Sequence, residues 1–107
     1  MVPIQNYKKF FTELVRKHMI IFGPNIATGT AASVQGLKVD ASGEVTEISG
    51  TPHLILQSLI GQYQQLSAPV TYLNVALLFE KYPDIKQEYN QPLPHVKLVC
   101  TLSEEHQ

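Results

Sequence analysis

Four histidines and one cysteine are the residues of this chain whose types could carry catalysis or bind a metal ion. The histidines are His18, His53, His95 and His106. None of them has a second histidine, a cysteine or a carboxylate at the spacing that is typical of a metal site. The phosphate-binding pattern G-x-x-x-x-G-K is also absent from the sequence. We therefore expect no catalytic residues, no metal and no cofactor.

His18 has the strongest case for a function, because it falls on the expected buried face of the first helix. A lone imidazole there could bind a ligand, or it could be a core histidine with one hydrogen bond. Cys100 falls on the apolar face of a predicted strand, where a single cysteine usually packs as a small hydrophobic side chain. No basic neighbour or helix N-terminus is evident that would activate its thiol.

Two helices are predicted in the first third of the chain. Residues 4–22 are expected to form the first, because their apolar side chains recur at spacings of three and four. Gly23 and Pro24 interrupt this pattern, since the residue before a proline disfavours helical angles. A short second helix with small side chains is expected over residues 24–34, and Gly36 is the expected left-handed residue that follows it.

Two further helical patterns follow in the second half of the chain. Pro52 marks the start of the first, because Thr51 can cap a helix and proline suits the first helical position. Pro69 then either kinks one long helix or opens a new helix that Ser67 caps. From residue 70 to residue 82 the apolar side chains lie on nearly every side of the predicted helix.

A small antiparallel sheet is expected beside these helices. A hairpin covers residues 37–48, where Asp40 and Gly43 suit a turn that is closed by a left-handed residue. Residues 84–94 are polar and are predicted to form a loop. Residues 95–102 alternate apolar and polar side chains, which predicts a half-buried strand that could pair with the hairpin.

Length and composition limit the fold and the function classes. A chain of 107 residues fits a single domain over residues 1–107, here a helix-dominated α+β domain with three to four helices and the small sheet. Charged residues make up 16% of the chain, against about 25% in typical soluble domains. The net charge of −1 disfavours nucleic-acid binding and leaves little repulsion between copies.

The expected location is the cytoplasm. The apolar stretches fall short of the roughly 18 residues that a membrane span needs, and the N-terminus lacks the apolar core of a signal peptide. A single cysteine cannot form an internal disulfide, so nothing indicates an oxidising compartment.

The helices that are apolar on all sides lead to the functional expectation. One domain has only one interior, so such helices must be enclosed completely by the other elements or covered by a second chain. The other predicted elements are few, which favours a second chain. We expect a non-catalytic regulatory or scaffold module that acts, in signalling or regulation, through a homo-oligomer (a dimer or larger) or a partner protein. The expected interface residues are Phe11, Ile20, Phe22, Leu73, Leu77 and Phe79. The alternative is a small-molecule sensor whose apolar pocket between helices is lined by His18, Tyr63 and Tyr72.

Overall fold

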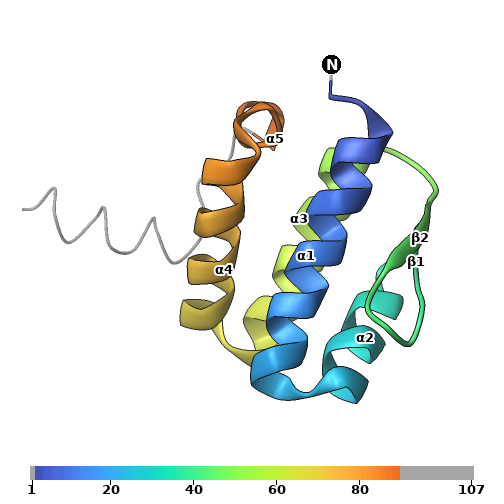
Figure 1. Ribbon diagram of the computed structural model, residues 1–107, viewed down its shortest axis with the longest axis vertical. Helices are drawn as coiled ribbons and strands as arrows, with labels where there is room; N and C mark the ends of the chain where they lie inside the picture. The colour runs from blue at the N-terminus through green and yellow to red at the C-terminus, as the bar shows by residue number, and fades with distance from the viewer. Residues whose placement is uncertain (1, 90–107) are drawn as a thin grey trace, which may run out of the picture.

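A computed structural model describes residues 2–89 of the chain as five helices and one β-hairpin (Figure 1). The helices are α1 (Ile4–Phe22), α2 (Pro24–Ala32), α3 (Pro52–Leu66), α4 (Ala68–Lys81) and α5 (Pro83–Tyr89), and the strands are β1 (Leu37–Val39) and β2 (Val45–Ile48). The expected helix-dominated α+β class is confirmed, with one helix more than predicted. The predicted strand over residues 95–102 lies outside the described residues.

Helix α1 is the central element of the fold, and it packs against α2, α3, α4 and β2. Helices α4 and α5 lie on one side of α1 and the hairpin lies on the other (Figure 1). The core between these elements receives large side chains from α1, α3, α4 and α5. Its fully buried members include Tyr7, Phe10, Phe11, Leu14, Leu56, Leu59, Ile60, Tyr63, Leu78 and Ile85.

The hairpin forms where the sequence predicts it, with Leu37 opposite Ile48 in an antiparallel ladder. Gly43 closes its turn with a φ of +89°, which confirms the predicted left-handed residue. A two-stranded ribbon is marginal in water and needs cover. Helices α1 and α2 provide that cover, and Thr12 of α1 accepts a hydrogen bond from the backbone N–H of Val45 at 3.0 Å.

The start of α3 is predicted correctly, but its cap is not. Pro52 occupies the first turn of α3, whereas the side chain of Thr51 makes no capping hydrogen bond. The backbone carbonyl of Thr51 accepts the N–H of Ile55 instead, at 3.1 Å. Ser67 does cap the next helix, because its hydroxyl accepts the N–H of Val70 at 3.3 Å. The chain therefore forms two helices here and not one kinked helix.

The prediction of a loop over residues 84–94 is wrong for its first part, because α5 continues from Pro83 to Tyr89. Ile85 and Tyr89, one helical turn apart, are both buried. This helix packs against α3 and α4. It therefore supplies part of the cover that the sequence led us to expect from a second chain.

Candidate functional site

His18 lies fully buried between α1, α3 and α4. Its imidazole stacks on the ring of Tyr63, with 3.8 Å between the ring centroids and 13° between the planes. The ring of Phe22 lies 5.8 Å from that of His18. The fold thus brings together two of the three residues that were expected to line a ligand pocket. Their rings are in van der Waals contact, so no ligand fits between them.

Both ring nitrogens of His18 have polar neighbours. Nδ1 lies 3.1 Å from the carbonyl oxygen of Leu14, and Nε2 lies 3.3 Å from the hydroxyl oxygen of Thr71. The side-chain nitrogen of Asn74 is 3.4 Å from Nδ1. Because Thr71 and Asn74 come from α4, these contacts hold α1 and α4 together through buried polar groups.

Burial favours the neutral form of the His18 imidazole. Desolvation holds the pKa of His18 below its ordinary value, and the hydrogen bond with the Leu14 carbonyl opposes this shift only in part. None of the hydrogen-bond partners found for His18 within residues 2–89 is charged. The imidazole is therefore neutral near pH 7. A group that is neutral and closed to solvent suits core packing better than proton transfer to a substrate.

Tyr63 completes this cluster from α3. Its hydroxyl donates a hydrogen bond to the carbonyl of Ala27 in α2 at 2.8 Å. Burial raises the pKa of the phenol well above its ordinary value, so the hydroxyl keeps its proton and stays a donor. Tyr72, the third expected ligand contact, is partly buried against the hydrophobic core.

Thr71 and Asn74 are the site residues that sequence reasoning missed. Both are buried polar residues on the inner face of α4. The available signal was their spacing, since the two residues interrupt an apolar stretch and lie three positions apart on one helical face. Buried polar groups need hydrogen-bond partners, so such a pair indicates a polar residue on the facing helix.

A second feature is an apolar surface along the junction of α1 and α4, which run antiparallel (Figure 1). The junction is fixed at one end by Glu13, which accepts a hydrogen bond from the ammonium group of Lys81 at 2.8 Å. Two turns after Glu13, Ile20 projects from the same side of α1. Leu77 and Leu73 lie one and two turns before Lys81 on α4.

These large apolar side chains are exposed to solvent. The exposed fractions are 84% for Ile20, 52% for Ile21, 58% for Leu73 and 55% for Leu77. We call these four residues the α1/α4 apolar face. A group of large apolar side chains on a surface is typical of a contact site.

The structure narrows the set of expected interface residues. Phe11 is fully buried in the core, and Phe79 is also buried, with its ring 5.7 Å from that of Phe10. Phe22 is partly buried beside His18. Phe11 and Phe79 therefore belong to the interior of the chain itself. Of the six expected residues, Ile20, Leu73 and Leu77 are exposed and Phe22 is partly exposed, and their role in an interface stays a prediction.

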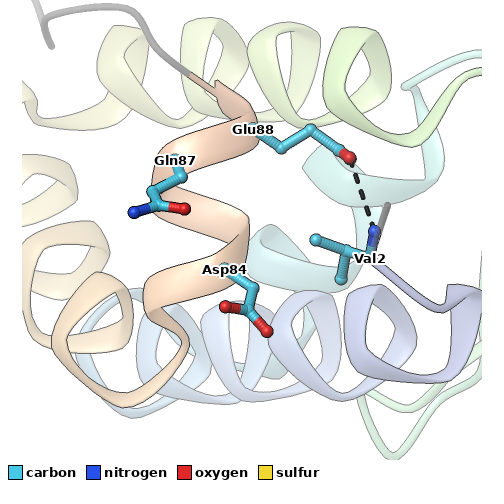
Figure 2. Close-up of a pocket in the computed structure, with 4 residues that line it drawn as sticks. All are labelled: Val2, Asp84, Gln87 and Glu88. Carbon is cyan, nitrogen blue, oxygen red and sulfur yellow. Dashed lines mark hydrogen bonds between the residues drawn. The ribbon is translucent and has the colours of Figure 1, made fainter.

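A polar hollow of about 410 Å³ opens between the N-terminal end of the chain and α5 (Figure 2). Its lining includes Val2, Asp84, Gln87 and Glu88. The carboxylate of Glu88 reaches across the hollow and accepts the backbone N–H of Val2 at 3.4 Å. It also accepts the hydroxyl of Tyr7, which lowers the pKa of Glu88. The Glu88 carboxylate thus ties α5 to the first residues of the chain.

Within residues 2–89 there is no group of three or more histidine, cysteine, aspartate or glutamate side chains that could hold a metal ion. In the same range, none of the helices has both the length and the hydropathy to cross a bilayer. Comparisons of the chain with models of protein families, with curated proteins and with solved structures gave no match in any of the three.

Proposed function

We propose that the protein is a non-catalytic regulatory or scaffold module of the cytoplasm that acts by self-association through the α1/α4 apolar face. The observation that carries this proposal is the exposure of Ile20, Ile21, Leu73 and Leu77 along one junction between two helices. A second copy of the same chain is the proposed partner, and other proteins that present an apolar helix are the alternative.

The charge of the chain supports a second copy as the partner. With a net charge of −1, two copies repel each other only weakly. Residues 1–38 hold five basic residues and one acidic residue, which gives +4, and residues 39–107 hold three basic and eight acidic residues, which gives −5. Opposite charge in the two parts of the chain favours contacts between different parts of neighbouring copies.

The free energy gained by burying the α1/α4 apolar face between two copies indicates reversible association. Full burial of a leucine or isoleucine contributes about 1.5–3 kcal/mol. Ile21, Leu73 and Leu77 are already about half-buried, so their complete burial adds about half of that free energy, and the more exposed Ile20 adds more. Eight such side chains across two copies give on the order of 6–12 kcal/mol. The loss of translational and rotational freedom offsets much of this gain. We therefore expect a dimer that forms in the micromolar range.

Sedimentation velocity over the micromolar range tests the proposal. We expect the natural chain to associate and the double variant Leu73→Ser, Leu77→Ser to sediment as a monomer. Leu54→Ser is the matched control, because Leu54 lies on α3 with 52% of its side chain exposed and does not belong to the face. A natural chain that stays monomeric throughout the range would contradict the proposal, as would equal loss of association in the control.

The alternative function is a small-molecule sensor, and residues 2–89 offer no support for its apolar pocket at His18 and Tyr63. The pocket expected between helices would require space beside His18 and Tyr63, and these rings stack directly on each other. The polar hollow at Glu88 differs from the apolar pocket that this function needs.

A further inference from the structure

The apolar side chains Leu73 and Leu77 form an exposed stripe on α4. A segment later in the same chain has apolar side chains that suit this stripe. We propose that residues 95–102 dock on this α4 stripe within the same chain and compete there with a second copy. The docking stands on its own observations, whereas its regulatory meaning rests on the proposed self-association. Docking of the segment would make Leu73 and Leu77 unavailable to a second copy.

The first argument is the chemistry of the segment. Alternate residues from Val96 to Leu102 are apolar, namely Val96, Leu98, Cys100 and Leu102. In an extended segment these side chains share one face, and that face is stabilised only where it meets an apolar surface. The α4 stripe is such a surface.

The second argument is the place from which the segment starts. Helix α5 ends at Tyr89, whose ring lies 5.6 Å from that of Phe79 on α4. The chain from Tyr89 to residue 95 can span about 20 Å when extended. A helix with its side chains is about 10–12 Å wide, so residue 95 can reach the far side of α4. An eight-residue extended segment is about 26 Å long, which is enough to pass over both leucines.

The hairpin is a poorer match for the apolar face of this segment. It lies across α1 from α4 and α5, so the chain from Tyr89 would have to pass around the central helix (Figure 1). Its outward side chains are polar, and Lys38 and Glu47 form an exposed ion pair at 3.6 Å. An apolar strand face gains little on such a surface.

The reaction rate of the Cys100 thiol reports on the docking, because Cys100 is the only cysteine of the chain and lies within the segment. We expect its thiol to react with a soluble disulfide reagent at least about tenfold more slowly in the native chain than in the denatured chain, equivalent to about 1.4 kcal/mol of docking free energy. The measurement is made on the full chain, at a dilution where sedimentation shows only monomers. A native rate equal to the denatured rate would overturn the proposal.

Variants of α4 locate the covered surface. The double variant Leu73→Ser, Leu77→Ser should raise the reaction rate of Cys100 towards that of the denatured chain, and Leu54→Ser should leave the rate unchanged. Circular dichroism shows whether each variant keeps the native helix content. An equal rise in the folded Leu54→Ser control, or no rise in the folded double variant, would overturn docking on the α4 stripe. Protection of the thiol that appears only at high protein concentration would assign the cover to a second copy.

The competition is tested separately by weakening the segment itself. Leu98→Ser should speed the reaction of Cys100 and, because it removes the competitor, strengthen self-association in sedimentation experiments. Weaker or unchanged association would overturn the competition. Different results contradict the two proposals. Equal reaction rates of Cys100 in the native and denatured dilute chain contradict the docking. Absence of association in both the natural chain and Leu98→Ser contradicts the proposed function.

Discussion

Acidification should destabilise this protein through His18 at a pH where Glu13 and Glu88 still carry their charge, because the pKa values of these two carboxyl groups are lowered. His18 is fully buried and its pKa in the folded chain lies below its ordinary value, mainly because of desolvation. In the unfolded chain the same imidazole titrates near pH 6.5. As the pH falls below about 6.5, the unfolded state therefore takes up a proton that the folded state does not.

The sign and the size of the effect follow from this difference. The contribution of His18 to stability is fully present above its unfolded pKa and is lost as the pH falls towards its lower folded pKa. While the unfolded state binds one proton more than the folded state, the free energy of unfolding falls by about 1.4 kcal/mol for each pH unit. This loss precedes that from Glu13 and Glu88, because their pKa values are lowered from 4.5 and their contribution to stability is lost only as the pH falls below that ordinary value.

Urea denaturation at half-unit steps between pH 7 and pH 5 measures the slope. His18→Gln is the control, because glutamine keeps polar atoms in the cluster and does not titrate. We expect the slope of the natural chain to exceed that of the variant by up to about 1.4 kcal/mol per pH unit. Equal slopes in two folded proteins would refute the reasoning, since they would show that the burial of His18 does not control its protonation.

Three further predictions concern stability and are measured by denaturation. Gly43→Ala should cost at least about 1 kcal/mol, because Gly43 has a φ of +89° and its new Cβ would lie 2.5 Å from a side-chain sulfur of α1; an unchanged midpoint would contradict the turn geometry. Ser67→Ala should cost about 1 kcal/mol through loss of a helix cap, whereas Thr51→Ala should cost less because its side chain caps nothing; the reverse order would refute this assignment. Tyr7→Phe should cost about 1.5–3 kcal/mol at pH 7, because the hydroxyl donates to the charged carboxylate of Glu88; the loss should shrink when acid protonates Glu88, and a loss independent of pH would argue against the contact.

Local signals in the sequence were enough to predict most of the fold. The break between α1 and α2 follows from Gly23 and Pro24, and the hairpin turn follows from Asp40 and Gly43, because these residues restrict the backbone where they stand. The sequence does not predict helix α5, because its seven residues contain too few apolar positions to show a helical period.

The candidate site was predictable only in part, because its contacts join distant segments. The position of His18 on the buried face of its helix follows from the helical period alone. Its stacking on Tyr63 and its pairing with Thr71 depend on how α3 and α4 pack, which no local pattern encodes. The exposure of Leu73 and Leu77 also depends on packing, since only the tertiary fold decides which side of an apolar helix stays uncovered.

The contacts between the two ends of the described chain have a consequence for the order in which the protein folds. Tyr7 pairs with Glu88 across 81 residues, and Glu13 pairs with Lys81 across 68. During synthesis α1 emerges before α4, whose Phe79 packs against Phe10 of α1. The nascent chain therefore carries an amphipathic helix with an open apolar face until α4 and α5 are complete. Contacts of such long sequence separation slow folding, so we expect the native state to form in one cooperative step that requires α4 and α5.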